Sequence, residues 1–334
     1  MMVLSSIWIG IIGLGIIIYV ILDGFDLGVG ILSLFFVGRD RDIMISSILP
    51  VWDGNETWLV LGGAVLYGAF PLAFSILLPT LYLPILLMVV ALLFRGVAFE
   101  FRLKADASRQ FWDVMFALGS IVATGMQGLM LGSFVQGFNV TPNDIQNLVF
   151  PAYDWITPFS VACGVALLFG YALLASTWLI AKTEGELQKQ CYAIAKKCLF
   201  ITAFFGLLLS VWSPFIDPLI SQRWFAKNHL LYLAILPILG IIFWLSALRA
   251  LRDKKEHAPF WFVIAVFLCC YIGFIITSWP YIVPRSLPYW QAAAPEGSLK
   301  FMLVGAAIML PILFYYTYHS YRIFRGKVTD VIKY

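Results

Sequence analysis

Nine long apolar segments, joined by short polar connections, constrain this chain more than any other feature of its sequence. A helix needs roughly 20 predominantly apolar residues to cross a membrane. A soluble domain of 334 residues has no core large enough for a chain that is 62% hydrophobic and 12% charged. The sequence therefore predicts an all-α integral membrane protein forming one membrane domain over residues 1–334. The predicted spans are 7–35, 56–77, 79–99, 112–135, 158–181, 198–216, 228–248, 260–281 and 300–321.

The basic residues alternate between the two sides of these spans. Of the 22 lysines and arginines, 18 fall on one side, and only Arg223, Lys227, Arg285 and Lys300 fall on the other. Because basic residues collect on the cytoplasmic side of membrane proteins, the count predicts an external amino terminus and a cytoplasmic carboxy terminus. Topology and anionic lipid account for the net charge of +4, so no nucleic-acid partner is indicated.

Residues that could ligate a cofactor are few and poorly placed. His229, His257 and His319 fall near the ends of apolar segments, so two histidines cannot face each other across a haem at the membrane centre. No spacing is typical of a Cys/His metal site, and the cysteines are interpreted as small buried apolar residues. We therefore expect no metal and no haem in this chain. The cysteines are Cys163, Cys191, Cys198, Cys269 and Cys270.

Two aspartates interrupt the first apolar segment. Asp23 and Asp26 are spaced i, i+3 and so share one helix face. A charged group at this depth costs about 2.5–3.5 kcal/mol on insertion scales, so it normally faces a partner or a wet cavity. Gly15, Gly24, Gly28 and Gly30 thin the same helix and permit a close neighbour. The pattern indicates a functional acidic site.

A second acidic group precedes the next apolar segment, in the sequence WDGNE of residues 52–56. Asp53 and Glu56 have the spacing of a capping box, which would make Asp53 the residue that caps the helix amino terminus. The same position at the mouth of a helix also suits the transfer of a proton inward. Both interpretations stay open. The turn near Asp40 lies about midway between Asp26 and Asp53, so a hairpin would bring these two acids to similar depth.

The third segment ends with RGVAFEFR, residues 95–102. Glu100 could pair with Arg95 or Arg102 across about one helical turn. We interpret this group as an ion-pair knot at the membrane boundary in preference to a conducting group. The candidate proton-path residues are thus Asp53, which is favoured, with Asp26, Asp23, Glu56 and Glu100.

These motifs together resemble subunit II of the cytochrome bd-type quinol oxidases, the non-haem subunit of the bacterial cytochrome bd and cyanide-insensitive oxidase family. The resemblance runs end to end, although Gln291 stands where an acid is common and Arg285 adds a charge. It rests on DGFDLG at 23–28, WDGNE at 52–56, RGVAFEFR at 95–102, and WPYIVP at 279–284 with Ser286, Leu287 and Trp290.

The resemblance implies nine helices in two four-helix bundles plus one peripheral helix, in the bacterial inner membrane. It implies a haem-bearing partner, subunit I, which holds haems b and d, oxidises quinol and reduces dioxygen to water in an electrogenic reaction. Subunit II would support assembly and help form a cytoplasmic proton route on which Asp53 lies, without being catalytic alone. Lipid surrounds such a complex, and the resemblance leaves open a structural quinone and a small single-helix accessory subunit.

A proton-coupled secondary transporter is the alternative from another class. Transporters often carry broken helices in corresponding halves of the chain. Here the acids concentrate in the first third of the sequence, and the later segments carry essentially no central charge. That asymmetry favours a chain that completes the site of a partner.

Overall fold

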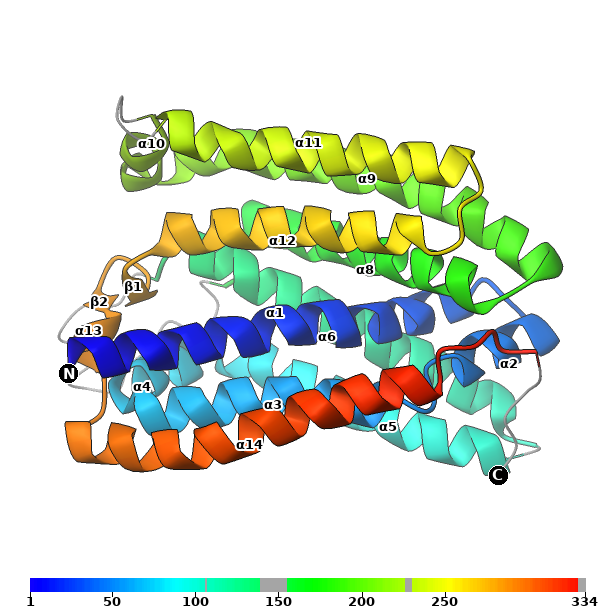
Figure 1. Ribbon diagram of the computed structural model, residues 1–334, viewed down its shortest axis with the longest axis horizontal. Coiled ribbons are helices and arrows are strands. Elements are labelled where there is room, and N and C mark those ends of the chain that lie inside the picture. Colours follow the sequence, from blue (N-terminus) through cyan, green and yellow to red (C-terminus); the bar gives the residue numbers. More distant parts are fainter. Residues whose placement is uncertain (106, 139–154, 226–229, 330–334) are drawn as a thin grey trace.

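The computed structural model describes residues 1–105, 107–138, 155–225 and 230–329, and helices dominate them (Figure 1). Eight helices of the described chain are long and apolar enough to cross a membrane: α1, α5, α6, α8, α9, α11, α12 and α14. The elements are α1 (Met2–Ser33), α2 (Arg39–Ser46), α3 (Trp52–Ala69), α4 (Pro71–Thr80), α5 (Tyr82–Lys104), α6 (Arg109–Gln136), α8 (Pro158–Lys182), α9 (Gly185–Ile216), α10 (Pro218–Phe225), α11 (Leu230–Arg252), α12 (Ala258–Ser278), β1 (Tyr281–Val283), β2 (Leu287–Pro288), α13 (Tyr289–Ala292) and α14 (Glu296–Ile323).

The predicted second span differs most from the structure. Residues 56–77 are divided between α3 and α4, which meet at Phe70 with φ −134° and ψ 60°. Pro71 causes the break, because proline has no N–H to donate and disfavours helical backbone in the residue before it. The carbonyl of Ala69 at the end of α3 accepts a hydrogen bond from the Ala294 N–H at 2.9 Å. The segment before α14 thus compensates for the interrupted helix inside the membrane region.

Helix α1 occupies the centre of the packing. It contacts α3, α6 and α8 along much of its length, while α5 packs on α6, α8 on α9, and α11 on α12. Figure 1 shows these long helices lying side by side along one axis, with α14 on the outside against α1 and α3. Most of the connection between α6 and α8 lies outside the described chain, as does His229.

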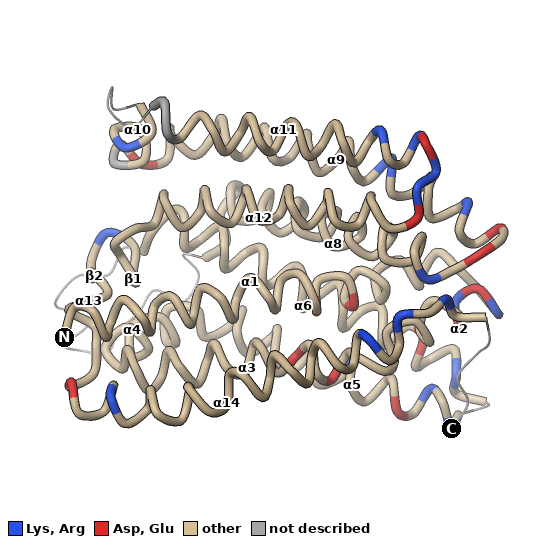
Figure 2. The backbone as a smooth tube through the Cα atoms, in the orientation of Figure 1, with Lys and Arg blue, Asp and Glu red and all other residues tan. Residues whose placement is uncertain are grey.

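Charged residues gather mainly at one end of the helix bundle, the end nearest α2 in Figure 2. There Arg102 of α5 donates to Asp42 of α2 and to Asp113 of α6, each at 2.5 Å. Arg41 adds a 2.6 Å bond to Asp113, and Arg109 a 2.7 Å bond to Asp42. An ion-pair knot therefore ties α2 to the ends of α5 and α6. Its acids are Asp42 and Asp113, and the predicted Glu100 takes no part in it.

The opposite end is closed by a small two-stranded sheet. Strand β1 pairs antiparallel with β2, opposing Val283 to Leu287. Val283 is buried in an apolar cluster with Trp8 of α1 and Phe70 at the α3–α4 break. This cluster fixes the outer ends of α1, α3 and α4 together and so sets the register in which α1 meets α3.

Candidate functional site

An arginine inside the membrane region holds two of the predicted acids together. Arg95 of α5 donates through Nη2 to Oδ1 of Asp23 on α1 at 2.7 Å and to Oε1 of Glu56 on α3 at 2.7 Å. The side chains of Arg95 and Asp23 are completely buried, and that of Glu56 is 26% exposed. Three helices thus meet in one ion triad, and only its Glu56 end reaches the surface of this chain.

Asp26, one turn along α1 from Asp23, is also completely buried, and it makes no ion pair with any described residue. Its Oδ2 accepts a hydrogen bond from Nδ2 of Asn55 at 2.7 Å. The Asn55 Oδ1 in turn accepts from the hydroxyl of Tyr321, on the peripheral helix α14, at 2.9 Å. A second polar chain therefore runs from α14 through α3 to the buried acid on α1.

Asp53, the favoured proton-path residue, lies in the first turn of α3 and is exposed. The helix begins at Trp52 after Val51, and no side chain caps it. The capping interpretation of Asp53 is therefore wrong: the chain enters α3 through continuous turns, and the Trp52 N–H donates to the carbonyl of Ile48 in those turns. Asp53 stands three residues before Glu56, so both carboxylates project from the same side of α3.

The two predicted partners of Glu100 bind other acids. Glu100 is 66% exposed and lies 4.0 Å from Lys104, one turn along α5. Arg95 faces inward to the acids on α1 and α3, and Arg102 faces the ion-pair knot. The prediction that Glu100 pairs with Arg95 or Arg102 is wrong. Both arginines lie on the face of α5 that packs inside the protein, whereas Glu100 lies on the exposed face.

Two glycines let neighbouring helices pack directly against the backbone of α1, beside the buried acids. A side chain at Gly28 would overlap the backbone carbonyl of Tyr171 on α8, and one at Gly30 would overlap the Ser120 hydroxyl on α6. The predicted role of these glycines, close approach by a neighbour, is confirmed. Asp23 and Asp26 thus lie on a helix that α6 and α8 cover closely, while their hydrogen-bond partners come from α3 and α5.

A further polar chain continues inward from the triad. Tyr19, one turn before Asp23 on α1, accepts a 2.7 Å hydrogen bond from the side-chain amide of Gln127 on α6. The hydroxyl of Tyr171 on α8 donates to the amide oxygen of Gln127 at 2.8 Å. These three neutral side chains thus satisfy one another's hydrogen bonds where α1, α6 and α8 meet.

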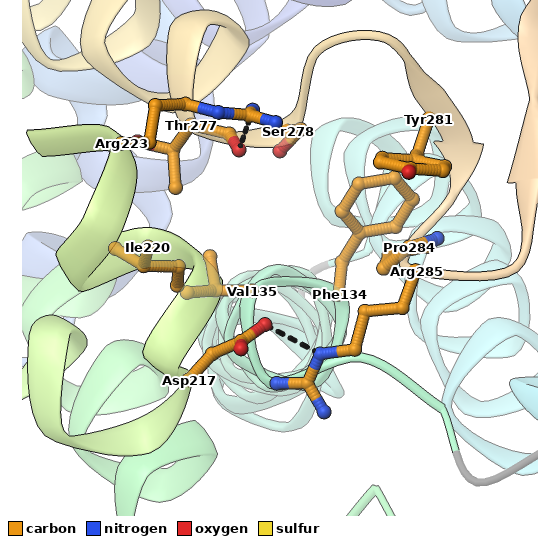
Figure 3. Close-up of a pocket in the computed structure, with 10 residues that line it drawn as sticks. All are labelled: Phe134, Val135, Asp217, Ile220, Arg223, Thr277, Ser278, Tyr281, Pro284 and Arg285. Carbon is orange, nitrogen blue, oxygen red and sulfur yellow. Dashed lines mark hydrogen bonds and ion pairs between the residues drawn. The ribbon is translucent and has the colours of Figure 1, made fainter. Parts of the chain in front are cut away.

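A small pocket at the opposite end of the molecule has a different composition (Figure 3). Its volume is about 40 Å³, and it lies between the outer ends of α6, α10 and α12 and the β1–β2 turn. Arg285 of the turn pairs with Asp217 at 2.6 Å, and Arg223 donates to the carbonyl of Thr277 at the end of α12 at 2.7 Å. Both guanidinium groups thus join outer segments of the chain and lie away from the buried acids.

The described residues contain no cluster of three or more His, Cys, Asp or Glu side chains arranged to hold a metal ion. All five cysteines are free. Cys163, Cys191 and Cys198 are buried as predicted, whereas Cys269 is only half-buried and Cys270 is exposed on α12. None of them lies among the acids of α1 and α3.

Comparisons with known proteins show the family to which the chain belongs. The family profile for cytochrome bd terminal oxidase subunit II matches residues 4–324. This chain belongs to that family. It is 27% identical to the cytochrome bd-I ubiquinol oxidase subunit 2 of Escherichia coli K12, over 98% of this chain and 96% of the relative. It is 28% identical to the cytochrome bd ubiquinol oxidase subunit 2 of Bacillus subtilis, over 98% and 97% of the two chains.

A solved structure shares the fold of this subunit II chain. The bd oxidase from Geobacillus thermodenitrificans superposes with a TM-score of 0.78 at 18% sequence identity, covering 96% of this chain and 98% of that one. The subunit II chain is therefore a multi-pass protein of the bacterial inner membrane and a component of a bd-type oxidase complex. The family also indicates that the haems belong to the partner subunit.

Sequence reasoning missed the centre of the site in this subunit II chain. It counted Arg95 among the cytoplasmic basic residues and gave Asn55 and Tyr321 no role. A signal for Arg95 was present, because an arginine that follows an apolar run without a break needs an acidic partner inside the protein. Nothing in the local sequence of Tyr321 indicated that α14 would return to α3.

Proposed function

We propose that this chain is the haem-free subunit II of a bd-type terminal quinol:oxygen oxidoreductase, and that it supports assembly and contributes a proton route from the cytoplasm. Haems b and d, quinol oxidation and dioxygen reduction belong to subunit I, so this chain is not catalytic alone. The oxidase relatives named above and the coverage of nearly the whole chain support this assignment. A structural quinone and a single-helix accessory subunit are compatible with it but have no residues assigned.

We propose nine membrane crossings within one membrane domain, with α3 and α4 together making the second. The eight long apolar helices and this broken pair support that number. Met1 and the end of α14 lie at opposite ends of the molecule, in keeping with an odd number of crossings (Figure 1). The end rich in lysine and arginine is assigned to the cytoplasm, with the amino terminus outside. We divide the helices into two four-helix groups, α1 to α6 and α8 to α12, which pack on each other through α1, α6 and α8, with α14 peripheral.

The proton route begins at Asp53 and passes to Glu56. The observation that carries this proposal is that Glu56 is partly exposed yet bound to Arg95, which holds the fully buried Asp23. Carboxylates that differ in access but share one cation form a graded path from the surface inward. Asp53 stands at the exposed end, where it can exchange protons with water or with groups of subunit I. Glu100 lies outside this path, because its carboxylate faces away from the triad and pairs with Lys104.

The test is Asp53→Asn in the assembled oxidase, with Glu186→Gln as the control. Because the Asp53 carboxylate is exposed and makes no ion pair with any described residue, the substitution leaves packing intact. Positioned proton transfer contributes about 10²–10⁴-fold to enzymatic rates, so oxygen consumption should fall roughly tenfold or more with haem content unchanged. Glu186 is 70% exposed on α9, and its loss should leave turnover unchanged.

Unchanged turnover in a fully assembled Asp53→Asn oxidase would remove Asp53 from the route. Loss of haem together with turnover would assign Asp53 to assembly instead. Purification of the tagged chain as a lone haem-free protein that exchanges a solute would favour the transporter alternative over the oxidase assignment.

A further inference from the structure

We infer that this chain holds a resident proton on Asp26, so that the acidic cluster of Asp23, Asp26, Glu56 and Arg95 carries one fewer negative charge than its composition suggests. The inference deepens the proposed proton route and rests on it only for its functional meaning. The bound proton on Asp26 can be detected in the resting oxidase, in which no reaction takes place.

The charges of the cluster do not balance. Three carboxyl groups surround one guanidinium, so full ionisation leaves two uncompensated negative charges. Asp23 and Asp26 are completely buried one turn apart on the same face of α1, where two carboxylates repel each other. A pair of buried like charges is relieved by binding a proton on one member. The cluster therefore has a place for one proton.

The hydrogen bonds decide which acid takes it. Asp23 and Glu56 each accept a charge-assisted bond from Arg95 at 2.7 Å, which favours their ionised forms. Asp26 has no cation as a partner and accepts only from the neutral amide of Asn55. Glu56 also retains access to solvent, whereas Asp26 is completely buried. Asp26 is thus the carboxyl group with the least stabilisation for a negative charge.

One oxygen of the buried Asp26 carboxyl is free to carry the proton. Within the described residues, Oδ1 of Asp26 is buried without a hydrogen-bond partner. A protonated Asp26 presents a hydroxyl at Oδ1, which converts an isolated acceptor into a donor for a neighbouring oxygen or water. The Asn55 amide can still donate to Oδ2, so the observed 2.7 Å bond persists in the protonated form.

The groups around Asp26 from the other helices do not supply the missing positive charge. Helix α3 contributes Glu56 and the amide of Asn55, α5 contributes Arg95, and α14 contributes the Tyr321 hydroxyl, which binds Asn55. Arg95 is the one cation among them and already serves two carboxylates. The same environment keeps the proton on Asp26 while Asp53 and Glu56 exchange theirs at the surface end.

The experiment is infrared spectroscopy of the assembled oxidase, which resolves the carbonyl stretch of a protonated carboxylic acid from ionised carboxylates. Labelling the aspartate side-chain carboxyl with ¹³C should shift one such band in the wild type. Asp26→Asn should remove that band, and Asp53→Asn should retain it. Asp26→Glu should move the band from aspartate labelling to glutamate labelling, which supplies the assignment if Asp26→Asn does not assemble.

A protonated-aspartate band that persists in Asp26→Asn, or the absence of any such band in the wild type, would overturn the inference. In Asp26→Glu, a band still sensitive to aspartate labelling would do the same. The test of the Asp26 proton is independent of the test of the proton route, because the infrared band is recorded in the resting oxidase. If the proposed route is wrong, Asp53→Asn leaves turnover unchanged and the Asp26 band is still present.

Discussion

Replacing Arg95 by glutamine should destabilise subunit II more than any other single loss of charge in its described part. The perturbation removes a buried cation that contacts Asp23 and Glu56, each at 2.7 Å. At an effective dielectric constant of about 20, each contact corresponds to roughly 6 kcal/mol of attraction before desolvation is counted. Most of that offsets the cost of burial, and breaking a buried pair by removing one partner costs about 3–5 kcal/mol.

Most of this cost falls on Asp23, which has no exposed surface, whereas Glu56 can turn toward solvent. The double variant Arg95→Gln with Asp23→Asn should therefore recover a large part of the lost stability. The assay is unfolding of the purified assembled oxidase in mixed detergent micelles, with Arg249→Gln as the control. Arg249 is 86% exposed and lies 3.7 Å from Asp253, so its loss should cost less than about 1 kcal/mol.

The reasoning is refuted if Arg95→Gln unfolds within about 1 kcal/mol of the Arg249→Gln control. It is also refuted if the double variant is no more stable than the single one, since the penalty would then not come from an uncompensated Asp23. If the destabilisation is large enough, Arg95→Gln prevents assembly of the complex and the double variant restores it, which also agrees with the reasoning.

Two other perturbations follow from the packing of α1 and from an ion pair made by the segment after α14. Gly28→Ala should destabilise the chain by about 1–3 kcal/mol in the same unfolding assay, because the new methyl group meets the Tyr171 backbone; Gly206→Ala, with open space around it, should not. The ion pair between Glu256 and Lys327, 2.8 Å apart, lowers the pKa of Glu256 and raises that of Lys327. Its contribution is present at neutral pH. It should be lost as pH falls through the lowered pKa of Glu256, or rises through the raised pKa of Lys327, and proteolysis of the segment after α14 measures this.

The helical architecture follows from composition, because apolar runs of this length have few other folds in lipid. The ends of the helices were less predictable. Helix α9 begins at Gly185, well before the predicted 198, since its charged first turns extend beyond the apolar run. The break at Phe70 was missed because the apolar pattern continues through Pro71, and only the hydrogen bond from Ala294 shows how the interruption is tolerated.

The site was predictable in its acids but not in their partners. Spacing alone places Asp23 and Asp26 on one face of α1, and the hairpin hypothesis brings α3 beside them. Asn55, two residues after Asp53, indeed binds Asp26. The partner Arg95 comes from α5, however, and its rotation about the helix axis depends on packing against α6 that no local pattern encodes. A single turn of α5 separates an inward arginine from the outward Glu100.

The distribution of buried charge indicates how the function is divided between subunits. In the described helices from α8 to α12, the one acid is Glu186, and it is exposed in the first turn of α9. The acids of α1 are buried against α6 and α8, and their polar contacts lead toward the surface through Glu56 and, by way of Asn55, through Tyr321. A self-contained transporter needs access from both sides of the membrane to its relay. A path of this kind, which opens at one end, is instead suited to serve a reaction centre in a partner subunit.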